Sequence, residues 1–435
     1  MKEEFRYIIG EWMGQRLPET IEREMELDLD AKKVIAIAGV RRSGKTYMLF
    51  ETIKRLLKRG VPRENILYVN FDDDRLQGAG TKELGEMLDA YGEIAAPKDG
   101  AEVFLLLDEI QNVRGWELWI RRIYDTGRYR IFITGSSSKL LSREIATALV
   151  GRNITYVMYP FSLREFLLSK GIVATKRELY SADMPRIERY AREYLIWGGF
   201  PEVAMAEKEE TKQRILSSYY DAILYRDIMT RYKIKDANRL SMVFRYAISA
   251  YGSGFSTVKL YNYFKSQNIS LSRQTINNFI KFGEQTFLFY QLMQFFKGFK
   301  RSNQSRKKLY VVDNGIAGLF ASAPEYGRLL ESAVYIELLR RKERDPSLEI
   351  NYLNDKDGEV DFIVSRKGVI LQAIQVTYEL NASNREREIR PLIRAIEKCK
   401  PERSILISFN PPGKELTIEK GIDVVSFVRW AITAP

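Results

Sequence analysis

The chain has 435 residues, enough for about two to four domains with cores of their own. It contains no histidine and a single cysteine, Cys399, which excludes imidazole catalysis, an intrachain disulfide and a thiolate zinc cluster. The net charge of +12 favours a polyanionic partner, nucleic acid before an anionic membrane; the alternative is a solvated basic surface without a partner.

The N-terminal segment, MKEEFRYIIGEWMG, carries acids where a secretory signal would carry bases. The longest apolar runs, such as residues 103–107, are too short to span a bilayer. We therefore expect a cytoplasmic protein with no membrane partner. Its abundance of Lys, Arg and Glu would suit a thermophile.

Residues 34–38, VIAIA, form an apolar run of strand length before the segment GVRRSGKT, which fits the pattern GxxxxGK[ST]. Apolar residues then recur at helical spacing, so the order of strand, glycine loop, lysine and helix predicts a phosphate-binding loop for ATP. Lys45 would contact the β- and γ-phosphates, and Thr46 would bind Mg²⁺. The predicted nucleotide-binding residues in this loop are Gly39, Arg42, Ser43, Gly44, Lys45, Thr46 and Tyr47.

Two arginines, Arg41 and Arg42, lie inside this loop. They would strengthen the local anion field, face a partner subunit, or pair with acids in residues 72–74, and the sequence leaves all three alternatives open.

The apolar run at residues 103–107 ends in Asp108 and Glu109, the arrangement of a Walker B strand. We predict that Asp108 holds the Mg²⁺ shell and that Glu109 polarises the attacking water; the alternative is a solvated acidic turn. Such a glutamate favours hydrolysis over binding alone. A further strand at residues 130–134 would bring Thr134 and Ser136 beside the γ-phosphate, with helix capping as the alternative.

The order of the phosphate loop, DEIQ, TGSSS, a helix ending in GR, YPFSLREF and WGGFPEV resembles prokaryotic and archaeal AAA-type ATPases with an uncharacterised C-terminal domain. The resemblance covers nearly the whole chain and implies an α/β ATPase core followed by a helical lid. It implies that Arg152, or second Arg143, reaches the γ-phosphate of a neighbouring subunit, with a plain surface arginine as the alternative. It also implies that Pro201 lies near the adenine.

Residues 240–251, 257–266 and 272–281 read as helices, and 288–296 and 308–312 as strands. This order predicts a winged helix, whose alternative role is that of a protein–protein spacer. The predicted DNA contacts are Arg273, Gln274, Asn277 and Lys281 on the last helix, and Lys300, Arg301, Lys307 and Lys308 in the acid-free wing.

The C-terminal part resembles the PD-(D/E)xK nuclease fold through a helix with Glu331, a strand with Asp361, and a strand with Gln375 and Thr377. Active members carry a glutamate and a lysine at the last two positions. A neutral amide is a poor Mg²⁺ ligand and threonine supplies no cation, so we expect a degenerate nuclease, unless Glu359 or Glu379 compensates.

We therefore predict an α/β protein in four parts: a P-loop ATPase core (1–157), a helical lid (158–230), a winged-helix domain (231–312) and a degenerate nuclease-like domain (313–435). Its cofactors would be ATP and Mg²⁺. The predicted function is ATP-driven remodelling of, or movement along, duplex or branched DNA such as a Holliday junction, by a homo-oligomer such as a hexameric ring. The alternative is an ATP-dependent signalling or defence switch that recruits a protein partner; an ATP-gated nuclease is disfavoured.

Overall fold

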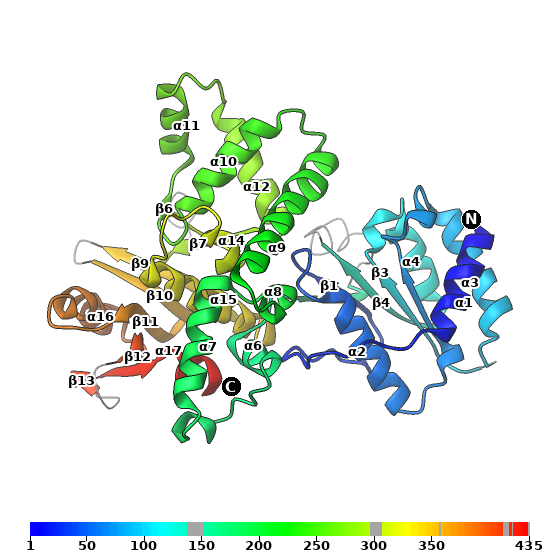
Figure 1. Cartoon of the computed structure of the whole chain (residues 1–435), viewed down its shortest axis with the longest axis horizontal. Coiled ribbons are helices and arrows are strands. Elements are labelled where there is room, and N and C mark those ends of the chain that lie inside the picture. The colour runs from blue at the N-terminus through cyan, green and yellow to red at the C-terminus, as the bar shows by residue number, and fades with distance from the viewer. Residues whose placement is uncertain are drawn as a thin grey trace. The chain divides into compact units, whose positions relative to one another are not determined.

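A computed structural model describes residues 1–98, 100–136, 149, 151–295, 307–355, 358–411, 417–419 and 421–433. The chain divides into two compact units (Figure 1). The first comprises Met1–Met158 with the short segment Gln285–Phe287, and the second comprises Tyr159–Glu284 and Leu288–Pro435. Within the part of the chain that is described, no helix combines the length and apolarity needed to cross a membrane.

The first unit is built on a five-stranded parallel sheet with the order β2-β3-β4-β1-β5. Strands β1 and β3 read as nearly continuous apolar runs because a parallel sheet is buried on both faces, whereas the edge strand β5 is half-buried. The carboxyl ends of β1, β3 and β4 meet at one edge, where the predicted nucleotide residues follow the strands. The strands are β1 Val34–Ala38, β2 Ile66–Asn70, β3 Val103–Asp108, β4 Tyr129–Gly135 and β5 Asn153–Val157.

In the described part of the first unit, four α-helices accompany this sheet. Helix α2 begins directly after the glycine loop, and its apolar side chains Met48, Leu49 and Ile53 are buried. The indole of Trp12 in α1 donates to the Ile66 carbonyl (2.8 Å), which ties that helix to the start of β2. The helices are α1 Lys2–Gly14, α2 Lys45–Lys58, α3 Thr81–Ala95 and α4 Trp116–Asp125.

The second unit begins with helices. Ser162 caps α6, where its hydroxyl accepts from the Glu165 amide (3.1 Å) and the Glu165 carboxylate accepts from the Ser162 amide (2.9 Å). Helix α17 packs against both α6 and the sheet, and Arg164 donates to the Ile432 carbonyl. The helices are α6 Leu163–Ser169, α7 Met184–Trp197, α8 Pro201–Met205, α9 Glu209–Asp221, the π-helix η6 Ala222–Thr230, α10 Ala237–Ser249, α11 Thr257–Ser266, α12 Arg273–Gln285, α14 Asn314–Gly318, α15 Tyr326–Arg344, α16 Arg385–Cys399 and α17 Phe427–Thr433.

A mixed nine-stranded sheet runs through the second unit in the order β13-β14-β12-β11-β10-β9-β7-β8-β6. Helices α15 and α16 pack against strand β11 of this sheet. The strands are β6 Gly254–Phe255, β7 Phe289–Gln294, β8 Lys307–Val311, β9 Leu348–Asp355, β10 Gly358–Arg366, β11 Val369–Glu379, β12 Arg403–Asn410, β13 Thr417–Glu419 and β14 Ile422–Ser426.

One pairing within this sheet differs from the expected organisation. Strand β7, expected in a separate winged-helix domain, pairs in parallel with β9 through Met293 with Asn351 and Gln294 with Tyr352. The segments expected as two domains, 231–312 and 313–435, therefore share one sheet and one compact unit. Met293 supplies one reason, because its carbonyl also accepts from the side-chain amide of Asn351 (3.3 Å).

Candidate functional site

The phosphate loop lies between β1 and α2, and its shape depends on two glycines. Gly39 has φ +156°, and a Cβ there would overlap the backbone carbonyl of Met158. Gly44 has φ +101° and immediately precedes the helix. Both positions therefore require glycine, which lets the backbone turn tightly into the helix N-terminus.

Lys45 is buried at the start of α2. Its ammonium donates to the carbonyls of Gly39 and Val40 (3.1 Å each) and lies 3.6 Å from a carboxylate oxygen of Glu109. The predicted phosphate-binding lysine and the predicted catalytic acid are thus within ion-pair distance across the site. The ammonium is held by weak neutral acceptors and one acid, all of which a phosphate oxygen can replace.

The side chains of Thr46, Asp108 and Thr134 meet next to the phosphate loop. The Thr46 hydroxyl donates to Asp108 Oδ2 (2.7 Å), and the Thr134 hydroxyl donates to Asp108 Oδ1. Strand β4 lies between β1 and β3, which brings Thr134 to this position. Hydroxyl and carboxylate oxygens are the donors that Mg²⁺ prefers, so Thr46 and Asp108 fit the predicted metal.

Burial dominates the electrostatics of Asp108. It raises the pKa of this carboxyl, the neighbouring Glu109 carboxylate raises it further, and the hydroxyls of Thr134 and Thr46 oppose the rise. The Tyr68 hydroxyl also donates to Asp108 Oδ2 (3.2 Å). A divalent cation would supply the positive charge that this buried acid lacks.

Glu109 is held as a carboxylate. Burial raises its pKa, but the charges of Lys45 and Arg41 and a hydrogen bond from Gln111 outweigh burial, so the pKa lies below its ordinary value. Its backbone amide donates to Thr134 Oγ1 (3.0 Å). A carboxylate fixed in this way can accept a proton from water.

Sequence reasoning missed Gln111 as a site residue. Its side-chain amide donates to Glu109 Oε2, and its own Oε1 is buried without a hydrogen-bond partner among the described residues. The available signal was the DEIQ sequence, in which a glutamine follows the predicted catalytic acid by two residues. Arg23 was missed as well, and it donates to the phosphate-loop carbonyl of Ser43 (2.9 Å).

The arginines and the tyrosine of the loop occupy different positions. Arg41 lies 3.7 Å from a carboxylate oxygen of Asp72, in agreement with one of the three alternatives for this arginine. Arg42 adopts a left-handed backbone conformation with φ +69°. Tyr47 is 53% exposed and lies edge-on to Phe50, so its ring is accessible.

Arg152 lies at the edge of the sheet opposite the phosphate loop. It directly precedes β5, and its carbonyl accepts from the amide of Val34 at the amino end of β1 (2.8 Å). The loop follows the carboxyl end of that strand, about 16 Å away for five residues. Its guanidinium pairs with Asp125 (2.9 Å). Arg152 therefore does not reach its own phosphate loop, and Arg143 lies outside the described residues.

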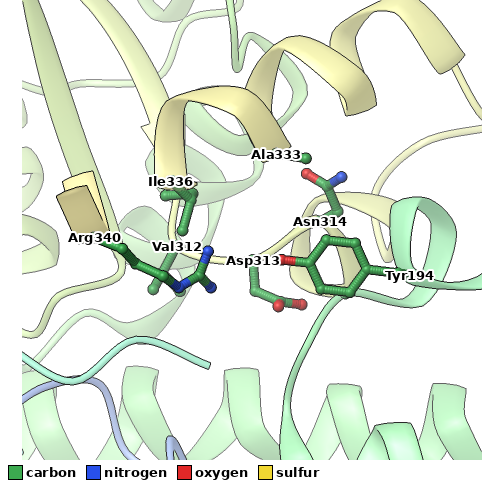
Figure 2. Close-up of a pocket in the computed structure, with 8 residues that line it drawn as sticks. Tyr194, Val312, Asp313, Asn314, Ala333, Ile336 and Arg340 are labelled. Atoms are coloured by element: carbon green, nitrogen blue, oxygen red, sulfur yellow. The ribbon is translucent and has the colours of Figure 1, made fainter. Parts of the chain in front are cut away.

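In the second unit, both glycines of WGGFP, Gly198 and Gly199, lie against Asp313, and a Cβ at Gly198 would overlap its carboxylate. The Gly199 amide donates to Asp313 Oδ2 (2.7 Å), and the Gly315 amide donates to Oδ1 (2.9 Å). Figure 2 shows this carboxylate between the side chains of Arg340 and Tyr194. The glycines are thus explained by packing within this unit. Pro201, the first residue of α8, stays a predicted adenine contact.

Helix α12 has the polar face predicted for a DNA-reading helix. Its inward side chains, Ile276, Phe279 and Ile280, are buried. The predicted contacts Arg273, Gln274, Asn277 and Lys281 are all exposed. The Arg273 guanidinium lies over the ring of Tyr261 at 5.0 Å, and the predicted wing residues Lys300 and Arg301 lie outside the described residues.

The prediction that Lys308 contacts DNA is wrong, because this side chain does not lie on the surface. Its side chain is 3% exposed and pairs with Glu359 (2.6 Å), Glu331 (2.9 Å) and Asp361 (3.6 Å). Successive side chains of a strand point to opposite faces, so Lys307 and Lys308 on β8 cannot both face solvent on the same side. The prediction treated the basic run as one surface, whereas Lys308 points into the protein.

The predicted nuclease-like residues Glu331, Asp361, Gln375 and Thr377 do come together, in a groove of about 1010 Å³. Asp361 Oδ2 accepts from the Val376 amide (2.8 Å), and burial, followed by the Glu331 charge, raises the pKa of Asp361. Gln375 donates to Glu388 (2.9 Å). No group of three acids in the described part of the chain is arranged to hold a metal ion.

Comparison with protein-family models assigns three consecutive segments, namely the AAA domain over residues 31–167, a domain of unknown function (DUF8612) over 188–325, and another (DUF4143) over 326–430. Neither of the last two descriptions specifies a winged helix or a nuclease fold. Both assignments therefore stay predictions.

Two curated relatives match along nearly their whole length. An uncharacterised protein of Methanocaldococcus jannaschii is 36% identical over 420 residues, which cover 95% of this chain and 91% of the relative. An uncharacterised protein of Haemophilus influenzae is 33% identical over 412 residues, which cover 93% of this chain and 95% of the relative.

Similar solved structures are more distant. A Walker-type ATPase of Pyrococcus abyssi is 12% identical with a TM-score of 0.44, covering 74% of this chain and 95% of that one. The ORC1 protein of Aeropyrum pernix, solved in complex with DNA, is also 12% identical with a TM-score of 0.27, covering 78% of this chain and 93% of that one.

Proposed function

Because the chain belongs to the protein family of its Methanocaldococcus and Haemophilus relatives and carries an AAA domain, we propose that it hydrolyses ATP with Mg²⁺ and couples this reaction to DNA. The observation that supports ATP hydrolysis most strongly is the group of four side chains at one edge of the sheet. Glu109, Lys45, Thr46 and Asp108 meet there within hydrogen-bond or ion-pair distance of one another or of a shared partner.

Each residue has a separate task in hydrolysis. Lys45 exchanges its carbonyl partners for the β- and γ-phosphates, and the glycine loop surrounds them with amides. Thr46 and Asp108 would hold Mg²⁺, which would neutralise the charge that develops on the phosphates. Glu109 orients the attacking water and accepts its proton, while Gln111 fixes the carboxylate in place.

DNA binding is assigned to α12 and the elements around it. The order α10, β6, α11, α12, β7, β8, with β6 and β7 on either side of β8, supports a winged-helix arrangement. The exposed Arg273 and Lys281 supply cations for phosphates, and Gln274 and Asn277 supply amides for base edges. The chain's net charge of +12 would draw DNA to the molecule.

Arg152 is assigned to a subunit boundary. Its position at the edge opposite its own phosphate loop supports action on the nucleotide of a neighbouring copy, which requires a homo-oligomer such as a closed ring.

The test is ATP turnover by the full chain without DNA and with single-stranded, duplex and four-way-junction DNA. Lys45→Ala serves as the blank because it removes the phosphate-binding ammonium. We expect turnover above the blank and stimulation by duplex or junction DNA. Turnover equal to the blank contradicts ATP hydrolysis. Turnover above the blank but equal in all four samples leaves hydrolysis standing, contradicts coupling to DNA, and favours a switch that recruits a protein partner.

A further inference from the structure

A buried lysine that the nuclease resemblance does not provide, Lys308, pairs with three acids that line the groove of the second unit. Lys308 comes from β8, whereas its partners come from α15 (Glu331) and from β10 (Glu359 and Asp361). Its ammonium lies 2.6 to 3.6 Å from one oxygen of each carboxylate. Three elements distant in sequence thus direct their charged groups at one point.

The ammonium is buried and pairs with three acids at once, and it donates a hydrogen bond to Glu331 (2.9 Å). A buried ammonium is tolerated only when it is paired, and breaking such a pairing is strongly destabilising. The three carboxylates are therefore committed to Lys308.

The same carboxylates are the groups that a divalent cation would need. Mg²⁺ takes carboxylate oxygens at about 2.0–2.1 Å, so an incoming ion would have to displace the ammonium from Glu331 and Asp361. Displacement would leave Lys308 buried without counter-charges. An internal cation and a metal ion therefore compete for one position.

Two neutral residues in the groove, Gln375 and Thr377, are consistent with a site whose cation is the Lys308 ammonium. Gln375 and Thr377 line the groove where an active nuclease would carry a further acid and its lysine. Gln375 donates to Glu388, while its Oε1 is buried without a hydrogen-bond partner among the described residues. With a cation already supplied from β8, an additional carboxylate at Gln375 would add buried negative charge without compensation.

We propose that the Lys308 ammonium occupies the cation position of this groove and excludes divalent metal ions from it. The groove then binds no divalent metal ion and has no cleavage activity. Removal of the ammonium opens a metal site on Glu331, Glu359 and Asp361. This inference rests on contacts within the second unit and does not depend on ATP hydrolysis or DNA binding.

The experiment is a Mn²⁺ titration of the full chain without nucleotide, followed by the electron paramagnetic resonance signal of free Mn²⁺. Lys308→Met should bind Mn²⁺ at least about tenfold more tightly than the unaltered chain, because one competing buried charge is gone. Lys307→Met, the neighbour on the same strand, is the matched control and should not differ from the unaltered chain. Every variant retains the phosphate loop, so binding there is common to all samples.

Adding Asp361→Asn to Lys308→Met should abolish the gain. The proposal is overturned if folded Lys308→Met, checked by circular dichroism, binds Mn²⁺ no better than the unaltered chain. It is also overturned if the unaltered chain binds Mn²⁺ at a site that Asp361→Asn removes, a comparison that does not need Lys308→Met to fold. If Lys308→Met is unfolded, Lys308→Gln, which keeps a polar side chain and all three carboxylates, carries the same expectation.

Discussion

At the scale of single residues, the proposed hydrolysis depends on Glu109 and Lys45. Glu109→Gln should lower ATP turnover by about 10²- to 10⁴-fold while nucleotide binding persists, because the amide cannot accept a proton from water. Single-turnover hydrolysis and equilibrium nucleotide binding measure the two effects. Glu117→Gln, in the first turn of α4, is the matched control and should leave both unchanged. Equal turnover by Glu109→Gln and the unaltered chain would contradict the assignment.

From the raised pKa of Asp313 we expect the unfolding free energy of the protein to depend on pH. Burial raises the pKa of Asp313 to about 6 from an ordinary 3.8, against the amides of Gly199 and Gly315. The folded protein thus holds the proton more tightly than the unfolded chain. This contribution to stability is full below the unfolded pKa and is lost as the pH rises through about 6.

The measurement is urea unfolding of the second unit at pH values from 4 to 7. Relative to Asp313→Asn, the unaltered chain should lose up to about 3 kcal/mol of unfolding free energy across this range. Asp221→Asn removes an exposed carboxyl and should follow the unaltered profile. Parallel profiles for Asp313→Asn and the unaltered chain would sink the prediction.

The meeting of the predicted nucleotide residues could be expected because their motif is local. Lys45 and Thr46 lie in one short segment of defined order, and Asp108 ends a recognisable strand. Lys308 was not predictable, because its inward direction depends on acids 23 and 53 residues further along the chain. A basic run gives no sign of which lysine is buried.

At the scale of elements, the turn between α7 and α8 depends on Gly198. Its φ of +74° and ψ of −164° are accessible essentially to glycine alone, and a Cβ there would overlap the Asp313 carboxylate. Gly198→Ala should therefore lower the unfolding free energy by about 3 kcal/mol or more. Gly318→Ala is the control, since its Cβ would meet its nearest atom at 3.7 Å. An effect of Gly198→Ala no larger than the control's would contradict this account.

The assignment of α12 to the DNA interface leads to a prediction about how DNA affinity depends on salt concentration. Changing Arg273 and Lys281 together to Gln should weaken duplex binding across all sequences and reduce the salt slope by about one for each phosphate that is no longer neutralised. Fluorescence anisotropy at several salt concentrations measures both quantities. Lys208→Gln with Arg214→Gln removes the same charge from exposed positions in and beside α9 and should have little effect. An unchanged slope in the α12 variant would remove α12 from the DNA interface.

Most element positions followed from sequence periodicity. The helix expected at 257–266 coincides with α11, and the strand expected at 34–38 coincides with β1. The pairing of β7 with β9 did not follow, because strand neighbours depend on contacts that no local pattern records. The expected boundary at 312/313 fell between two parts of one sheet for that reason.

At the scale of the whole molecule, Arg152 distinguishes a lone subunit from an assembly. Mixing Lys45→Ala subunits with Arg152→Ala subunits should restore part of the ATP turnover that each lacks alone, because each supplies what the other is missing. Asp125→Ala is the matched control, since it releases Arg152 without removing it. Turnover lost equally in Asp125→Ala and Arg152→Ala would indicate a structural ion pair, and no recovery on mixing would contradict action across subunits.

The contact between α6 and α17 has a consequence for synthesis on the ribosome. All the strands of the first unit come from residues 1–158, so its sheet can close as soon as that stretch has emerged. The second unit is completed later, because residues 163–169, which also pack against α7 and α8, lack their contact with residues 427–433 until those residues have emerged. A chain halted between these points would carry the closed sheet of the first unit together with exposed apolar surface, the state that chaperones and proteases recognise.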